Sequence, residues 1–369
     1  MEIGIDNFVS QVMDPRTGKT VPSDVRMKQF LAEVVTADRS GVDTFGIGEH
    51  HHRHFLDSAP VVILSAAAAL TEQIRLRTAV TVLSADDPVR LFEQFATVDL
   101  ISGGRVEMVL GRGSFTEAFP LFGLDLADYD SLFEEKLGLI LQLREDPHPH
   151  WSGRHRAPLT GQGVYPRPVQ ERLPMWIGVG GTPSSFARAG SLGLPLMVGI
   201  IGGDPRRYLP LIDLYREAGA RAGHPSESLQ VGIHCFGFVG DTDQQAADDF
   251  WPGYHRTMST TGRERGMPEP TRARYDAECG ADGAFFVGSP ETVAGKIVRL
   301  AEAVGGLARF TMQMTNAIMA PESMHNAIEL LGRKVKPLVH STAGITTHDV
   351  PRNGRLRPIS TQSNRRTTT

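Results

Sequence analysis

The sequence has little cysteine and no long apolar run. Cys235 and Cys279 are the only two cysteines among 369 residues, too few for a disulfide framework or a CxxC metal site, and they fit a reducing compartment. The longest apolar run, residues 59–70, is too short to span a bilayer. The opening MEIGIDNF has neither a basic start nor an apolar signal core. We therefore expect a cytoplasmic protein with no membrane partner.

An excess of charge of one sign is lacking too. The 38 Lys and Arg residues nearly balance the 42 Asp and Glu residues, and the body of the chain has no block of like charge. Nucleic acids and anionic membranes favour a basic stripe, so neither is an expected partner. Hydrophobic residues make up 40% of the chain, which is enough for a sizeable core.

Short apolar runs rich in β-branched residues alternate with stretches of helical period. The expected strands are residues 3–8, 44–48, 74–83, 105–110, 175–179, 196–201, 231–239 and 307–314. The expected helices are residues 23–40, 59–71, 88–101, 129–144, 183–192, 205–222, 290–303 and 321–335. Four helices begin with proline after an N-cap residue, namely Asp87, Thr182, Asp204 and Ser289. This alternation predicts a single (β/α)8 TIM barrel.

Three segments are additional to the strands and helices of a minimal barrel. Residues 146–173 form an insertion before strand five. Residues 241–286 form a second insertion after strand seven, long enough for a lid, and four of its aromatic residues are candidates for lining a substrate pocket: Trp251, Tyr254, Phe285 and Phe286. Residues 340–369 are polar and lack aromatics, so we expect a barrel over 1–339 followed by a disordered tail.

The run from Gly48 to His54 follows strand two. The active-site loops of such a barrel gather at the carboxyl ends of its strands, and imidazole titrates near neutral pH, so Glu49 and His50 are the catalytic candidates. We interpret His51, His52 and His54 as solvated or capping residues. The pair His50 and His52 also resembles the HxH of metal-dependent hydrolases, but strands five and eight lack the further ligands. No metal is expected.

Glycine-rich turns follow strands four and five. Gly180, Gly181, Thr182 and Ser185 stand where a strand enters a helix, and free amides at a helix start favour an anion such as phosphate. The alternative is an ordinary tight turn. Arg112, beside Gly111, suits a phosphate or a ring carbonyl, or else it is a surface charge. The end of strand three is small and apolar, a surface on which a flat ring could lie.

These residues resemble the bacterial-luciferase (luciferase-like monooxygenase) family over roughly residues 1–339. The resemblance lies in four motifs in order: GEHH at 48–51, the stretch from DPVR at 87–90 to SGGR at 102–105, the turn GRG at 111–113, and GGT at 180–182. It implies FMN or the deazaflavin F420 bound across the carboxyl ends of the strands. It also implies that His50 corresponds to the family's histidine beside the flavin, which acts as an acid or a base.

Further roles follow from the same resemblance. It puts Ala79 and Val80 at a non-prolyl cis peptide behind the flavin ring, and it assigns Arg112, Thr182 and Ser185 to the flavin phosphate. Luciferase itself has a cysteine where this chain has Gly111 and a tyrosine where it has Phe115, which weakens any claim of light emission. His234 in strand seven is another candidate, because some alkanesulfonate-type members use a histidine there. The alternative for His234 is a core histidine with satisfied hydrogen bonds.

The leading hypothesis is a two-component monooxygenase. A separate flavin reductase would supply reduced FMN, which reacts with O2 to oxygenate a small organic substrate. The absence of GxGxxG after the first strand fits a partner reductase. The alternatives are an F420-dependent dehydrogenase or reductase and a non-catalytic flavin-binding protein. Because residues 59–70 are apolar nearly all round, we also expect a homodimer. The substrate stays open.

Overall fold

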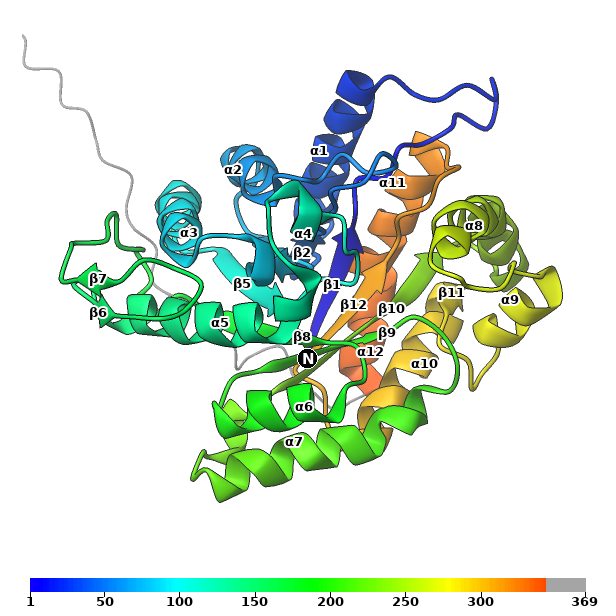
Figure 1. The fold of residues 1–369 in the computed structure, drawn as a ribbon. Helices are drawn as coiled ribbons and strands as arrows, with labels where there is room; N and C mark the ends of the chain where they lie inside the picture. Colours follow the sequence, from blue (N-terminus) through cyan, green and yellow to red (C-terminus); the bar gives the residue numbers. More distant parts are fainter. Residues whose placement is uncertain (343–369) are drawn as a thin grey trace, which may run out of the picture.

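Eight parallel strands close into one barrel in the computed structural model, which describes residues 1–342 (Figure 1). In order around the barrel they are β1 (Glu2–Asn7), β2 (Thr44–Ile47), β3 (Arg75–Thr78), β5 (Val106–Gly111), β8 (Met175–Val179), β9 (Leu196–Ile200), β10 (Val231–Val239) and β12 (Arg309–Gln313). Pairing between β12 and β1 closes the ring, with Glu2 opposite Arg309. Parallel strands buried on both faces explain the near-continuous apolar runs in the sequence.

Helices surround the barrel and connect successive strands (Figure 1). They are α1 (Ser23–Arg39), α2 (Pro60–Leu70), α3 (Pro88–Ser102), α5 (Tyr129–Glu145), α6 (Pro183–Ser191), α7 (Leu209–Arg221), α10 (Pro290–Ala303) and α11 (Pro321–Leu330). Asp87, Asp204 and Ser289 accept hydrogen bonds from the first-turn amides of their helices, as N-cap residues do. The predicted (β/α)8 TIM barrel is confirmed. None of the helices among residues 1–342 is long and apolar enough to cross a membrane.

Several expected boundaries were wrong. The strand expected over 74–83 is divided at the Ala79–Val80 peptide, which is cis, into β3 and β4 (Thr81–Val82). The helix expected over 205–222 begins with a 3-10 turn, η3 (Pro205–Tyr208). The last helix continues through a π-helical turn, η6 (Leu331–Val335), into α12 (Lys336–Thr342). The barrel boundary expected at residue 339 therefore falls inside α12, and residues 343–369 of the expected tail lie outside the described residues.

Both expected insertions contain secondary structure. Residues 146–173 include an antiparallel pair, β6 (His150–Trp151) and β7 (Leu159–Thr160), which lies outside the barrel (Figure 1). Residues 241–286 contain α8 (Asp243–Thr257), a π-helical turn η5 (Met258–Gly262) and α9 (Arg272–Cys279). The short strand β11 (Phe286–Gly288) follows and pairs with β10 outside the barrel ring.

The remaining short elements lie in the connections between strands and helices. They are η1 (Leu83–Ala85), α4 (Ala118–Leu121), η2 (Leu126–Asp128) and η4 (Ser226–Ser228). Of these, α4 and η2 belong to the long connection between β5 and α5. This connection lies beside the ends of the central strands (Figure 1).

A polar network centred on Asp6 fills one layer of the barrel interior. The buried Asp6 carboxylate lies 2.5 Å from Arg77 Nη2 and 2.5 Å from His234 Nδ1, and it accepts a hydrogen bond from the Thr311 hydroxyl at 2.7 Å. His234 Nε2 lies 3.1 Å from Gln313 Oε1. Burial raises the pKa of Asp6, but the Arg77 charge and the His234 hydrogen bond outweigh it and lower that pKa to about 2. Both ring nitrogens of His234 thus have partners, as in a satisfied core histidine.

Candidate active site

His50 lies in the loop that follows β2, with one ring nitrogen held by a buried carboxylate. Its Nδ1 lies 3.0 Å from Oδ2 of Asp57, whose side chain is fully buried. The carboxylate accepts a hydrogen bond from Nδ1, and this contact fixes the orientation of the ring and leaves Nε2 for other partners. Burial raises the pKa of Asp57, with the positive charge of His50 opposing the shift. The sequence reasoning missed Asp57, because a seven-residue spacing within an irregular loop carries no periodic signal.

Three phenylalanines surround the His50 imidazole. Ring centroids of Phe8, Phe55 and Phe115 lie 4.9, 4.2 and 4.8 Å from that of His50. Apolar rings at these distances keep water away from most of the imidazole and limit its motion. The imidazole is therefore held on three sides by apolar rings as well as by Asp57.

The loop after β1 places Phe8 against His50 through a constrained backbone. Val9 has φ +44°, which is a genuine outlier for a β-branched residue. Two hydrogen bonds hold it: the Phe8 amide donates to the Thr315 hydroxyl at 2.7 Å, and the Val9 amide donates to the Asn7 side chain at 3.0 Å. The end of β12 therefore helps to position a ring that contacts the candidate catalytic histidine.

Glu49 connects the ends of two strands. Its Oε2 accepts the Val82 amide at 2.9 Å, and its Oε1 lies 3.3 Å from Nε2 of His51. The hydrogen bond with Glu49 raises the pKa of His51 against the opposing effect of burial. Both carboxylate oxygens of Glu49 are engaged within the protein, which is the arrangement of a positioning residue. Its expected part in proton transfer stays a prediction.

The residues expected at the phosphate come together at the ends of β5 and β8. Arg112 Nη2 donates to the hydroxyls of Thr182 at 3.4 Å and Ser185 at 3.3 Å. Its Nη1 pairs with Asp130, and the guanidinium lies over the Tyr129 ring. The side chains of Arg112, Thr182 and Ser185 are separated by up to 73 residues in sequence and converge only because β5 and β8 are neighbours.

Thr182 is the N-cap residue of α6, as the sequence predicted, but it does not cap the helix with its side chain. The Thr182 side chain makes no capping hydrogen bond, because its hydroxyl faces Arg112 instead. The space beside Gly180 is open, since a Cβ there would meet no heavy atom within 4 Å, and Gly181 has φ +134°. Uncapped amides, two hydroxyls and a guanidinium form a donor set that fits a phosphate monoester.

The Val80 side chain fills the space between β4, β5 and β8. A Cβ on Gly111 would lie 2.5 Å from Val80 Cγ2, and one on Gly178 would lie 2.6 Å from Val80 Cγ1. Val80 packs beside a small buried cluster that includes Val109 and Trp176. Gly111 was a candidate for cofactor binding, and in the structure it also leaves the room that Val80 occupies. The cis peptide that the resemblance implied at Ala79–Val80 is present.

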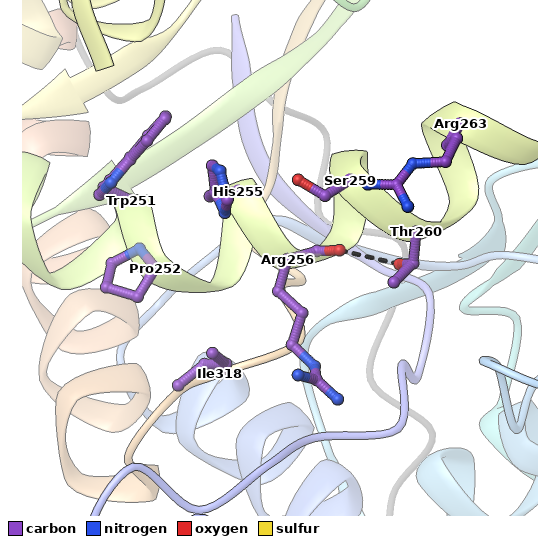
Figure 2. Close-up of a pocket in the computed structure, with 8 residues that line it drawn as sticks. All are labelled: Trp251, Pro252, His255, Arg256, Ser259, Thr260, Arg263 and Ile318. Atoms are coloured by element: carbon purple, nitrogen blue, oxygen red, sulfur yellow. Dashed lines mark hydrogen bonds between the residues drawn. The ribbon is translucent and has the colours of Figure 1, made fainter. Parts of the chain in front are cut away.

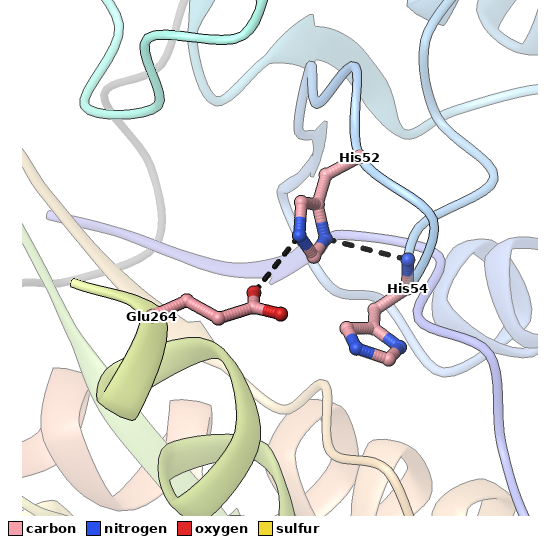
Figure 3. A group of neighbouring side chains, drawn as sticks. All are labelled: His52, His54 and Glu264. Atoms are coloured by element: carbon pink, nitrogen blue, oxygen red, sulfur yellow. Dashed lines mark hydrogen bonds and ion pairs between the residues drawn. The ribbon is translucent and has the colours of Figure 1, made fainter.

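His52, His54 and Glu264 form the one group of possible metal ligands among residues 1–342, with ligand atoms within 4.8 Å of one another (Figure 3). His52 Nε2 lies 3.0 Å from Glu264, and the Arg53 guanidinium pairs with the other Glu264 oxygen and donates to His54 Nε2. Burial, then the charges of His52 and Arg53, lower the pKa of His54. Because a metal cation would face the Arg53 charge, the donor set does not fit a metal.

This group instead connects two sides of the barrel mouth. We call residues 258–266, which include η5, the crossing segment. Its Glu264 pairs with His52 and Arg53 of the loop after β2, and its Arg265 donates to the Ser114 carbonyl at 3.2 Å and lies over the Phe115 ring after β5. Phe115 in turn contacts His50. The second insertion therefore reaches the loops that enclose the candidate catalytic histidine.

Two hollows adjoin α8. One of about 500 Å³ lies along one side of the helix and is lined by Trp251, Pro252, His255, Arg256, Ser259, Thr260, Arg263 and Ile318 (Figure 2). A second, of about 260 Å³, lies between the end of β9 and the second insertion and includes Tyr254 and Phe285 in its lining. Phe286 was also expected to line a pocket, and this was wrong: it is a buried residue of β11 that packs on Phe310.

Comparison with known proteins gives three findings. A family model described as luciferase-like monooxygenase matches residues 5–306. The 4-hydroxyprotoasukamycin monooxygenase of Streptomyces nodosus subsp. asukaensis is 26% identical over 352 residues, covering 89% of this chain and 90% of that protein. Two solved structures share the fold: the oxygenating constituent of 3,6-diketocamphane monooxygenase from Pseudomonas putida, in complex with FMN, and an F420-dependent secondary alcohol dehydrogenase.

The structural likeness extends over nearly the whole described chain. The diketocamphane enzyme is 21% identical with a TM-score of 0.70 and covers 91% of this chain and 98% of its own. The alcohol dehydrogenase is 18% identical with a TM-score of 0.71 and covers 92% of this chain and 98% of its own. At these identities the two structures support the fold and leave the choice of cofactor open.

Proposed function

This chain belongs to the luciferase-like monooxygenase family, and on that basis we propose that it is a flavin-dependent monooxygenase using reduced FMN and O2. A separate flavin reductase supplies the reduced FMN, and the substrate is a small organic molecule. The observation that carries the proposal is the convergence of Arg112, Thr182 and Ser185 beside the open start of α6. This donor set suits the phosphate of FMN.

Proton transfer, exclusion of water and positioning are assigned to residues of this chain. When bound, FMN supplies the electrons for the reaction with oxygen. Asp57 holds Nδ1 of His50, so that Nε2 is the atom available to give or take a proton. Phe8, Phe55 and Phe115 exclude water from the imidazole. Glu49 holds the end of β2 against β4, and Val80 offers the apolar surface beside the ring site.

An F420-dependent dehydrogenase or reductase is the second candidate function. The likeness to the F420-dependent alcohol dehydrogenase favours it, and a phosphate cradle serves FMN and F420 alike. A non-catalytic flavin-binding protein would use the same cradle. The retained pairing of His50 with buried Asp57 supports a catalytic protein over a binding protein, since binding a phosphate and a flat ring does not require it.

The experiment follows the reoxidation of reduced FMN. Reduced FMN is mixed with oxygenated buffer in the absence and presence of the protein, and the flavin absorbance is recorded in time. We expect the protein to change the reoxidation rate relative to free FMN, and we expect His50→Ala to alter that effect while the remote His148→Ala retains it. Reoxidation identical to that of free FMN, together with hydride transfer to F420 from an alcohol, would contradict the proposal.

A further inference from the structure

The cavity of about 260 Å³ between the end of β9 and the second insertion contains two arginines, Arg207 and Arg274. We call it the inner cavity. Arg207 donates only to the hydroxyl of Tyr208, at 3.3 Å, and lies over the ring of that residue. Within residues 1–342, no carboxylate forms an ion pair with either guanidinium. The inner cavity thus presents two positive charges that the described protein does not pair.

Neighbouring arginines on the same elements behave differently. Arg206 pairs with Asp204 and Asp282, and Arg272 pairs with Asp248 and Asp276. These partners lie outside the lining of the inner cavity. Acidic residues around the cavity therefore pair with the adjacent arginines and not with the two that line it. A general shortage of carboxylates nearby does not explain why Arg207 and Arg274 form no ion pair.

One acidic residue, Glu278, does line the inner cavity. Its two oxygens each lie 2.9 Å from the Gly203 amide, and one also accepts the Ala284 amide at 3.3 Å. Glu278 follows Arg274 by four residues on α9, the usual spacing for a helical ion pair. That pair is not formed, because the Glu278 carboxylate holds the loop after β9. The lining keeps an excess of one positive charge.

The rest of the inner cavity is largely apolar, with one free hydroxyl. Met258 and Phe285 belong to the lining, and the Tyr254 ring packs edge-on against Phe285 with centroids 5.1 Å apart. The Tyr254 hydroxyl has no hydrogen-bond partner among residues 1–342. Burial raises the pKa of Tyr254 to about 12, with the Arg274 charge opposing the shift, so this hydroxyl stays protonated at neutral pH and can donate a hydrogen bond.

The larger hollow along α8 is a useful comparison. Three of its lining residues, His255, Ser259 and Arg263, all contact the single carboxylate of Glu269, and the view in Figure 2 shows Arg263 and Arg256 on separate turns. Arg263 is therefore neutralised within the insertion, whereas Arg256 has no carboxylate partner among residues 1–342. The inner cavity differs in having two such arginines, Arg207 and Arg274, in its lining.

The inner cavity also adjoins the candidate cofactor site. The Tyr208 hydroxyl donates to the Gly180 carbonyl at 3.3 Å, and Arg207 donates to the same hydroxyl. Gly180 belongs to the turn that leads into Thr182 and the start of α6. One side chain, Tyr208, therefore separates Arg207 from the proposed phosphate site, so the inner cavity lies beside that end of the candidate cofactor site.

From these contacts we infer that the inner cavity binds the substrate, and that the substrate is a small organic acid. Its carboxylate, sulfonate or phosphate contacts Arg207 and Arg274, and its apolar body lies against Met258 and Phe285. Guanidinium groups suit such anions because they offer several donors in one plane. This inference rests on the proposed function, since it assigns a substrate class to the same enzyme. The carboxylated tail of F420 offers the same chemistry and is distinguished by the test.

The test compares two probes of the same length, octanoate and octanamide, binding to the FMN-loaded protein by calorimetry. We expect octanoate to bind roughly tenfold more tightly or better, the effect of charge-assisted hydrogen bonds. The double variant Arg207→Ala, Arg274→Ala loses this preference, and Arg274→Lys alone retains part of it. Arg206→Ala is the matched control and keeps the preference of the wild type. Thermal unfolding of each variant checks that it is folded.

Equal affinity for the two probes in the wild type would overturn the inference, as would a preference that survives in the double variant. A double variant that binds F420 more weakly while keeping its preference for octanoate would assign the arginines to a cofactor tail and would also overturn it. FMN affinity is measured on the same samples. If the wild type binds FMN but shows no preference for octanoate, this inference alone is contradicted. If the wild type fails to bind FMN, the proposed function is contradicted.

Discussion

At the scale of single residues, the pairing of His50 with Asp57 is the feature on which proton transfer depends. The Asp57 carboxylate is fully buried and meets only one ring nitrogen of His50. A buried acceptor that fixes the tautomer and orientation of an imidazole contributes to catalysis without touching the substrate. Asp57 is therefore a positioning residue, and it acts through His50.

Substitution of this pair gives the first prediction. General acid–base catalysis contributes roughly 10²- to 10⁴-fold, so we expect His50→Ala to lower kcat by about that factor. Asp57→Asn keeps the shape of the side chain and lowers kcat less, by roughly 10- to 100-fold, with a changed pH profile and an unchanged FMN affinity. The assay is steady-state oxygenation, with His148→Ala as control. An Asp57→Asn enzyme with the kcat and pH profile of the wild type would contradict the positioning role.

Much of the candidate site was predictable from single residues, and Asp57 shows where this failed. Glycines, an arginine and hydroxyls at the ends of strands carry a signal because strand ends meet at one face of a barrel. Asp57 stands between Leu56 and Ser58 in an irregular loop, and only the folded loop brings it to His50. The ion pair of Arg53 with Glu264 and the contacts of Arg265 with Ser114 and Phe115 were also beyond prediction, since these partners are distant in sequence.

At the scale of elements, the crossing segment joins the second insertion to the barrel loops. Its contacts with the loop after β2 are ion pairs between partly exposed groups, Glu264 with His52 and Arg53. Such pairs contribute about 0.2–1 kcal/mol each. Contacts of that strength can hold a segment in place and still release it on the timescale of ligand exchange.

The second prediction concerns this segment. We expect Glu264→Gln to raise the dissociation rate of bound FMN by roughly two- to fivefold, which corresponds to the loss of about 0.5–1 kcal/mol. The measurement is stopped-flow flavin fluorescence after dilution. Glu269→Gln is the control, because the polar contacts of the Glu269 carboxylate among residues 1–342 are with Ser259, Arg263 and His255 of the insertion itself. A dissociation rate unchanged in Glu264→Gln, or raised equally in both variants, would contradict a gating role for the segment.

The barrel strands could be predicted from the sequence, whereas some short elements could not. All eight barrel strands overlap the expected ranges, because buried parallel strands produce continuous apolar runs, and β1 and β5 each extend one residue beyond theirs. The three-residue strand β11 was missed, since so short a run has no period of its own. The π-helical turn η6 was missed for a different reason: Gly332 lies against the backbone of Ser40, and such a tertiary contact leaves no local pattern.

At the scale of the whole molecule, the Asp6 network joins β1, β3, β10 and β12 across the barrel interior. Asp6 has a pKa of about 2 in the folded protein, below the ordinary value of 3.8 for an aspartate. A lowered carboxyl pKa stabilises the fold above pH 3.8, and this stabilisation is lost as the pH falls toward 2. This lowering of the Asp6 pKa contributes about 2 kcal/mol to the stability of the folded protein above that range.

The third prediction tests this network. We expect Asp6→Asn to lower the free energy of unfolding at pH 7 by about 3–5 kcal/mol, because it leaves the Arg77 charge buried without its partner. We also expect the wild type to lose stability between pH 4 and pH 2 more steeply than the variant does. Urea unfolding at several pH values measures both effects, and Asp204→Asn at an exposed ion pair is the control. A loss no larger than that of the control would contradict the role of the network.

The fourth prediction concerns assembly. Val62 and Leu70 of α2 are 69% and 54% exposed, and Leu100 of the adjacent α3 is 50% exposed. An apolar patch on an outer barrel helix favours burial against a second copy, so we expect a homodimer through α2. Val62→Lys should shift the protein toward the monomer in sedimentation at micromolar concentration, while Val169→Lys on the first insertion should not. A wild-type monomer at that concentration would contradict the expectation.

The central claim is that Arg112, Thr182 and Ser185 hold the phosphate of FMN, and one titration tests it most directly. Riboflavin has the same ring as FMN but lacks the phosphate, so the ratio of the two dissociation constants isolates the phosphate site. We predict that the wild type binds FMN roughly 10- to 100-fold more tightly than riboflavin, and that Arg112→Ala loses most of this ratio. Equal binding of FMN and riboflavin by the wild type would contradict the account.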